Sequence, residues 1–358
     1  MRIHRNFRNI RGNTHVKKKL HRIMSNFGRF LLLSVCCLGL FLLSACGSGT
    51  NPGGAQQAFR TDTGDSSLQE SISEDPVPSS GSADSKGSRD NTPQCLVPEA
   101  SGTTTYGNEV VTIDASHTDE GYLCVSYVGD CPKVKLQITG PSQVTYTYNL
   151  SGNGYETFPL TSGNGTYSVG VYENISGTQY ATSFYQELTV TLADEFLPFL
   201  YPSQYVNFTP QSSSVLKAEE LAAPANTDLD VVSNVYNYVV ASISYDYEKA
   251  SGIASGYLSN VDETLRTGSG ICLDYAALMA AMLRSQGIPT HLEVGYAQEA
   301  YHAWISTYVD EKGWVNGIIE FDGTSWSLMD PTFAANSSEK SLKKFIGDGS
   351  NYTVKYVY

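Results

Sequence analysis

The sequence predicts a multidomain protein in which an antiparallel β-sandwich is followed by an α+β domain. Between residues 103 and 192, short segments rich in β-branched and aromatic residues alternate with turn clusters such as SGNG, which is typical of a small immunoglobulin-like sandwich. After residue 228, two segments of helical periodicity precede three strand candidates, which favours an α+β arrangement. The 358 residues allow two or three domains, and the 41% hydrophobic content is enough for their cores.

The first 45 residues have the organisation of an export signal. Nine Lys and Arg residues lie within the first 29 positions and precede the 16-residue apolar stretch Phe30–Ala45, whereas no acidic residue occurs before Asp62. That stretch is short for a membrane-spanning helix. It ends in Leu43-Ser44-Ala45-Cys46, which resembles the lipobox of bacterial lipoproteins.

The lipobox resemblance implies that residues 1–45 are a signal peptide and that Cys46 carries the lipid and becomes the mature N-terminus. We therefore expect an extracytoplasmic protein anchored by lipid to the bacterial cell membrane. A plain transmembrane anchor is the alternative, and it also places the remainder outside the cytoplasmic membrane. Without the leading segment the chain keeps 14 basic against 36 acidic residues, a balance that disfavours nucleic acid as a partner.

The rest of the chain divides by composition. Residues 46–102 are dominated by Ser, Gly, Asp and Pro, cannot bury enough apolar surface to fold, and are predicted to be a disordered tether. We expect the β-sandwich over residues 103–194. A connector of aromatics and prolines follows at 195–228, and the α+β domain occupies 229–358.

The elements of the last domain are predicted from periodicity and caps. A helix is expected over 229–240, with Thr227 or Asn226 as its N-cap, because apolar residues recur at helical spacing. A second helix is expected over 272–285, because Gly287 and Pro289, just after it, prevent the helix from continuing. The strand candidates are residues 291–296, 302–309 and 325–331.

Cys272 lies between a glycine-rich turn and this second helix, in GSGICLDYAALMAAML. Free amides at a helix N-terminus stabilise a thiolate and can donate to an oxyanion beside the sulfur. Gly270 leaves room for a substrate to approach. His302 begins the strand HAWISTYV and can take the thiol proton. Asp330 ends the strand SWSLMDP, expected beside that of His302, and can orient the imidazole.

Each of these residues has a structural alternative. Cys272 can be a buried, inert thiol, His302 a structural histidine, and Asp330 the first residue of a turn. Zinc binding by Cys272 and His302 is a further alternative, but no second closely spaced Cys or His accompanies them, as zinc sites usually require. The acidic residues show no EF-hand spacing, so we predict neither a metal nor another cofactor.

Five pieces of sequence agree in order with a known family. They are G-x-C-x-D-Y-A at 270–276, the boundary RSQGIP, the strand VGY, HAW at 302–304 and DPT at 330–332. Together they resemble the transglutaminase-like superfamily, over about residues 230–335. The resemblance implies a transglutaminase/papain-like fold with Cys272 as nucleophile, His302 as base and Asp330 as orienting acid. Tyr245, in ISYDY, falls where members often place an aromatic beside the oxyanion hole.

The resemblance also implies the chemistry. A cysteine of this family forms a thioester from an amide carbonyl, which an amine resolves by acyl transfer and water by hydrolysis. Many secreted bacterial members resemble proteases, so we expect a cysteine enzyme acting on amide bonds of protein or peptide substrates. The alternative is a catalytically inactive surface lipoprotein that binds or adheres through its β-sandwich. An enzyme of cell-wall peptides is a third interpretation.

The remaining cysteines leave one question open. Cys124 and Cys131 flank VSYVGD and can bridge a hairpin or stay free, and Cys95 has no obvious partner. The chain is therefore not a disulfide scaffold.

Overall fold

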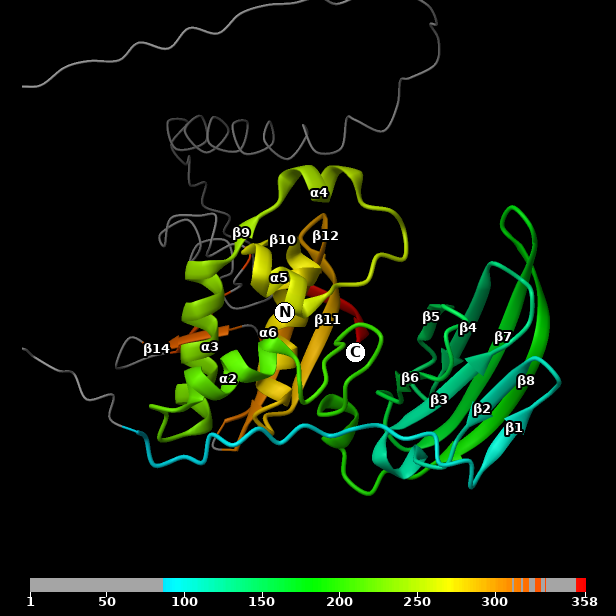
Figure 1. Ribbon diagram of the computed structural model, residues 1–358, viewed down its shortest axis with the longest axis horizontal. Coiled ribbons are helices and arrows are strands. Elements are labelled where there is room, and N and C mark those ends of the chain that lie inside the picture. Colours follow the sequence, from blue (N-terminus) through cyan, green and yellow to red (C-terminus); the bar gives the residue numbers. More distant parts are fainter. Residues whose placement is uncertain (1–85, 311, 317, 322–325, 330–331, 333–351) are drawn as a thin grey trace, which may run out of the picture. The chain divides into compact units, whose positions relative to one another are not determined.

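The computed structural model describes residues 86–310, 312–316, 318–321, 326–329, 332 and 352–358. All of them belong to one compact unit formed by residues 81–358 (Figure 1). The expected signal peptide, the lipobox with Cys46 and most of the expected tether lie outside the described residues, as does Asp330. Within the described part, no helix is long and apolar enough to cross a membrane.

The first part of this unit consists of two four-stranded antiparallel sheets, with strand orders β1-β2-β3-β6 and β5-β4-β7-β8. Side chains alternate between buried and exposed along strands such as β4, and the buried faces of both sheets join one hydrophobic core. The expected antiparallel, all-strand character of this segment is confirmed. The strand bounds are β1 (Thr105–Gly107), β2 (Val111–Asp114), β3 (Tyr122–Tyr127), β4 (Val134–Thr139), β5 (Thr145–Leu150), β6 (Glu156–Pro159), β7 (Gly165–Ser176) and β8 (Gln179–Val190).

The structure answers the disulfide question for this part of the chain. Cys124 and Cys131 are both free thiols, as is Cys95. The Cys124 thiol is buried in β3 beside the hydroxyl of Thr157, and burial raises its pKa to about 11. The hairpin-bridging alternative is therefore not realised.

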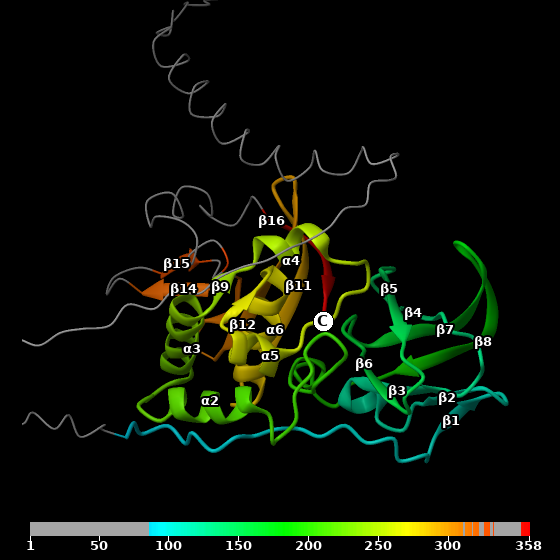
Figure 2. The same ribbon diagram turned by 45° about the horizontal axis from the view of Figure 1, so that its top comes forward.

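The helices of the second part surround α6, whose side chains are buried from Asp274 to Arg284. This helix packs against α2, α3 and α5 and, on another side, against β11 and β12 (Figures 1 and 2). Both predicted helices are confirmed, and the Thr227 hydroxyl accepts from the Asp230 amide in a capping box that begins α3. The bounds are α2 (Ser213–Ala222), α3 (Asp228–Ser242), α4 (Tyr247–Gly252), α5 (Val261–Thr267) and α6 (Cys272–Arg284), with short 3₁₀ turns at η1 (Thr118–Glu120) and η2 (Leu197–Phe199).

An antiparallel sheet of order β13-β12-β11-β16 completes the domain. The strands expected over 291–296 and 302–309 occur as β11 and β12. The strand before Asp330 does not pair with β12 as expected: β15 pairs with β14, and the partners of β12 are β11 and β13. The bounds are β9 (Ser244–Tyr245), β10 (Ser269–Gly270), β11 (Thr290–Ala297), β12 (Ala300–Val309), β13 (Gly313–Asn316), β14 (Ile318–Phe321), β15 (Trp326–Met329) and β16 (Tyr352–Val357).

The segment expected as a connector, residues 195–228, contains the helix α2, which packs on α3 and α6. The end of α6 is tied to this segment and to β16 by Arg284. Its guanidinium is fully buried and donates to the carbonyls of Thr290, Tyr201 and Tyr358, at distances between 2.7 and 3.0 Å. Through these hydrogen bonds, the one guanidinium holds three separate segments of the chain together.

Residues 86–98 run in an extended conformation past α2, drawn in cyan in Figures 1 and 2. The backbone N–H of Arg89 donates to the Ala225 carbonyl at 3.1 Å, just after α2 ends. The N–H of Gln94 donates to the Ser285 carbonyl at 2.7 Å, at the end of α6. The second bond satisfies a carbonyl that the end of α6 would otherwise leave without a partner.

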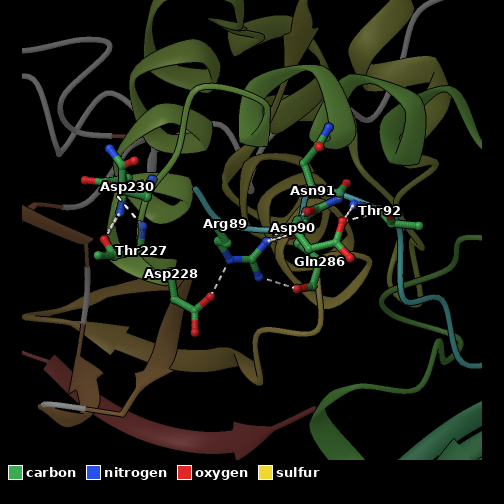
Figure 3. Close-up of polar contacts among 9 residues, drawn as sticks. Arg89, Asp90, Asn91, Thr92, Thr227, Asp228, Asp230 and Gln286 are labelled. Carbon is green, nitrogen blue, oxygen red and sulfur yellow. Dashed lines mark hydrogen bonds and ion pairs between the residues drawn. The ribbon is translucent and has the colours of Figure 1, made fainter. Parts of the chain in front are cut away.

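The side chain of Arg89 reinforces this attachment (Figure 3). Its Nε pairs with the carboxylate of Asp228, the first residue of α3, at 2.6 Å. Its Nη2 donates to the Gln286 carbonyl at 2.7 Å. Residues 86–102 had been expected to belong to a disordered tether, and the structure instead holds their first part against three helix ends.

Candidate active site

A short chain reversal positions Cys272 at the start of α6. Helix α5 ends at Thr267, and its C-cap Gly268 has a left-handed φ of 62°, which favours glycine. Ser269 and Gly270 then form β10, which pairs in parallel with β9. The Asp246 N–H donates to the Gly270 carbonyl at 2.9 Å, so the residues just before Cys272 have a fixed backbone.

The Cys272 thiol is free and half-buried. The N–H groups of Cys272 and Leu273 belong to the first turn of α6, and neither has a hydrogen-bond partner among the described residues. Unpaired amides at a helix N-terminus favour negative charge on the adjacent sulfur and can donate to an oxyanion. The expected position of Cys272 at a helix start is therefore confirmed, and its role as a nucleophile stays a prediction.

Asp274, two residues after the cysteine, is a functional candidate that the sequence reasoning missed. Its side chain is fully buried. One carboxylate oxygen accepts from the Ile271 N–H at 2.9 Å and from the Lys249 ammonium at 2.6 Å, while the other accepts from the Tyr257 hydroxyl at 2.6 Å. These three residues and Asp274 are called the Asp274 cluster below. It ties the first turn of α6 to α4 and to the loop that follows α4.

Gly270 has a packing reason as well as the expected role of leaving space for substrate. A Cβ built at Gly270 would lie 2.6 Å from the Cβ of Asp274, which is shorter than side chains tolerate. The glycine thus permits the close approach of β10 to the Asp274 cluster.

Tyr245 lies beside the same turn. In β9 it is the register partner of Gly270, two residues before Cys272. Burial, reinforced by the nearby Cys272 and by Tyr247, raises the pKa of its phenol to about 12. The hydroxyl is therefore protonated at neutral pH and can donate a hydrogen bond. The structure brings Tyr245 and Cys272 together.

His302 lies in β12, close to the hairpin that joins β11 to β12. It is buried, with 7% of its surface exposed, pairs with Gly295 of β11, and stacks on Trp304 with ring centroids 6.1 Å apart. Since α6 packs directly against β12, the helix of the cysteine and the strand of the histidine are neighbours. Asp330 lies outside the described residues.

The described part of the chain contains no group of three or more His, Cys, Asp or Glu residues that could hold a metal ion. The aromatic residues near the site differ in accessibility. Tyr275 and Trp304 are buried in the core, while Tyr301 is 60% exposed and Tyr247 is 70% exposed. The two exposed rings are available to a ligand.

Comparison with known proteins relates this part of the chain to a family. The model described as the transglutaminase-like superfamily matches residues 217–317, a segment that includes Tyr245, Cys272 and His302 and ends before Asp330. UPF0252 protein MJ1282 of Methanocaldococcus jannaschii is 30% identical over 114 residues, which are 28% of this chain and 32% of that protein. This chain therefore spans about a third of that relative's length.

Two solved structures are similar at low scores. A candidate cysteine protease from Cytophaga hutchinsonii is 16% identical with a TM-score of 0.31, over 64% of this chain and 69% of that one. Red sea bream transglutaminase is 12% identical with a TM-score of 0.23, over 59% of this chain and 48% of that one. These scores carry no argument about activity. Residues 217–317, which include the helices α3 and α6 and the strands β11 and β12, are the part of the chain that matches the transglutaminase-like superfamily.

Proposed function

We propose that this chain is a thiol-dependent enzyme that acts on amide bonds of proteins or peptides through a Cys272 thioester. The observation that carries the proposal is Cys272 itself, a free thiol at a helix start with unpaired amides beside it, inside the family match. His302 and Asp330 take the roles of base and orienting acid, and Tyr245 donates to the oxyanion.

The proposed reaction has two halves. His302 accepts the thiol proton as the sulfur attacks the amide carbonyl, and the oxyanion is stabilised by the Cys272 N–H and the Tyr245 hydroxyl. The carbon–nitrogen bond then breaks, and His302 returns the proton to the leaving amine. In the second half, water or a second amine attacks the thioester carbonyl and releases the thiol. Water gives hydrolysis, and an amine gives acyl transfer.

The proposal extends to location and domain roles. We infer a lipoprotein held by Cys46 on the outer side of the bacterial cell membrane, supported by the lipobox-like sequence. We also infer an immunoglobulin-like sandwich for residues 103–194, supported by the two four-stranded sheets that share a core. The proposed partners of the whole protein are protein or peptide substrates and the membrane, not nucleic acid.

The test uses the full-length chain with an unfolded protein substrate, reduced casein, and a fluorescent primary amine. New N-termini report hydrolysis, and amine incorporation reports acyl transfer. The Cys272→Ala variant should lose all activity, whereas Cys124→Ala, which removes the buried thiol of β3, should keep it. Activity that survives in Cys272→Ala, or the absence of both products in the wild type, contradicts the proposal and favours the binding lipoprotein.

A further inference from the structure

A pocket of about 630 Å³ lies where separate segments of the unit meet, and Cys272 is not among its lining residues. Its lining comes from residues 96–98, 155–157, 202–204, 207–211 and 258–259. Its volume lies in the range of small-molecule and peptide sites. We propose that this pocket binds an extended peptide segment that is uncharged or basic.

The charge of the lining selects against anionic ligands. It includes the carboxylate of Glu156, while no Lys, Arg or His is among the lining residues. Glu156 accepts from the Gln204 amide at 2.9 Å and from the Ser151 N–H at 2.7 Å. A phosphate or carboxylate would therefore meet negative charge with no compensating cation, whereas amides and ammonium groups would not.

Unpaired backbone favours a peptide over a saccharide. Leu96 and Val97 have no regular secondary structure, and their N–H groups have no hydrogen-bond partner among the described residues. A backbone N–H without a partner in the protein can donate to a carbonyl of a bound peptide. The walls also contain prolines and aliphatic side chains. Of the two aromatic residues, Phe208 is only 3% exposed, which leaves Tyr155 alone as an open ring.

A buried hydroxyl in the lining lacks a partner. Ser259 is 5% exposed, and its Oγ has no hydrogen-bond partner within the described part of the chain. A buried polar group without a partner is costly to stability, so such groups usually serve a ligand or an ordered water. A peptide carbonyl or N–H can satisfy this hydroxyl.

The pocket is connected to the Asp274 cluster through one short segment. Tyr257 donates to Asp274 at 2.6 Å, and Asn260 caps α5 by accepting from Glu263 at 3.0 Å. Leu258 and Ser259, between these two fixed points, line the pocket. A bound peptide would therefore touch the segment that supports the first turn of α6. That the peptide belongs to a substrate of Cys272 rests on the proposed function; the binding itself does not.

The experiment selects ligands from a random 12-residue peptide library on the full-length chain carrying Cys272→Ala, which removes the proposed chemistry. Enriched peptides are synthesised and titrated by calorimetry. Two variants perturb the pocket: Tyr155→Ala removes the open ring, and Asn207→Trp fills the volume from an exposed position. Tyr185→Ala is the matched control, because Tyr185 and Tyr155 are each 49% exposed and Tyr185 lies outside the pocket.

We expect enriched peptides to be depleted of Asp and Glu. Their affinity should fall by about tenfold or more in both pocket variants and stay unchanged in Tyr185→Ala, with thermal unfolding showing that all variants are folded. Equal affinity for Asn207→Trp and the parent protein, or no enrichment, overturns the proposal. Binding of chitotetraose that Asn207→Trp abolishes would overturn it in favour of a saccharide. Every titration uses the Cys272→Ala protein, so a failure to bind peptide does not bear on the thioester chemistry. That chemistry is tested separately by the casein and amine assay.

Discussion

Replacing Asp274 by Asn isolates the charge of the Asp274 cluster from its shape. The Asn side-chain oxygen can keep the bonds from Ile271 and Lys249, because its amide group can turn toward the Tyr257 hydroxyl, which is able to accept. The hydrogen-bond geometry is thereby retained. What is lost is the negative charge opposite the Lys249 ammonium.

The expected cost follows from the exposure of the partners. The Lys249 side chain is 31% exposed, so loss of its counter-charge should cost only about 1 kcal/mol, near the value for partly solvated pairs. Losing the charge assistance of the other two bonds should add about 0.5–1 kcal/mol each. A total of about 2–3 kcal/mol lowers Tm by about 5–10 °C in a unit of this size. Asp274→Ala, which removes all three bonds, should cost about 3–5 kcal/mol.

Thermal unfolding of the two variants, followed by circular dichroism, measures these differences. Glu263→Gln is the matched control, because Glu263 pairs with Arg266 at 2.5 Å on the surface of α5 and its loss should leave Tm unchanged. If Asp274→Asn unfolds at the temperature of this control, the carboxylate charge does not anchor α6 and the reasoning is refuted.

Two further predictions test the packing and the acid sensitivity of the domain. Gly270→Ala should lower Tm and slow the alkylation of Cys272, because the new Cβ would collide with Asp274. Gly252→Ala is the control: a Cβ at Gly252 meets nothing within 4 Å, so neither Tm nor the alkylation rate should change. Equal behaviour of the two variants contradicts the packing argument. Burial lowers the pKa of His291, and this effect outweighs the hydrogen bond that its imidazole donates to the Glu293 carboxylate, which raises the pKa. The unfolded chain therefore takes up this proton first as pH falls below about 6.5, and stability is lost from there downward. His291→Phe should reduce the fall in the urea midpoint between pH 7 and pH 5, and an unchanged fall shows that another group is responsible.

Elements with a local sequence pattern were predicted correctly. Helix α3 carries both its apolar period and its cap, since Thr227 is followed three residues later by Asp230. Helix α6 and the strands β11 and β12 have equally local signals. Helix α2 was missed although its buried residues Val215, Ala218 and Ala222 recur at helical spacing; its N-cap Ser212 makes no side-chain capping bond, and its 10 residues pack against α3 and α6.

The Asp274 cluster was not predictable because its bonds are long-range. Lys249 and Tyr257 are 25 and 17 residues from Asp274, and contacts between a loop and a helix leave no period in the sequence. One signal was available: Asp274 occupies the third position of α6, where a carboxylate commonly accepts from the residue before the helix.

The segment after residue 85 was misjudged for a different reason. Composition measures how much apolar surface a segment can bury, and by that measure residues 46–102 resemble a tether throughout. Arg89 and Gln94 are held instead by polar bonds to the ends of α2, α3 and α6. Such bonds depend on where helices end in space, which composition does not report.

The central claim, that Cys272 and His302 form an activated pair, is tested most directly by alkylation at pH 7. The full-length wild type, His302→Ala and His117→Ala are exposed briefly to iodoacetamide, and each cysteine is mapped by mass spectrometry. Cys124 is an internal reference, because burial raises its pKa to about 11. We predict that Cys272 is labelled much faster than Cys124, and that its rate falls by about tenfold or more only in His302→Ala. Labelling of Cys272 as slow as that of Cys124, and equal in all three proteins, would contradict the account.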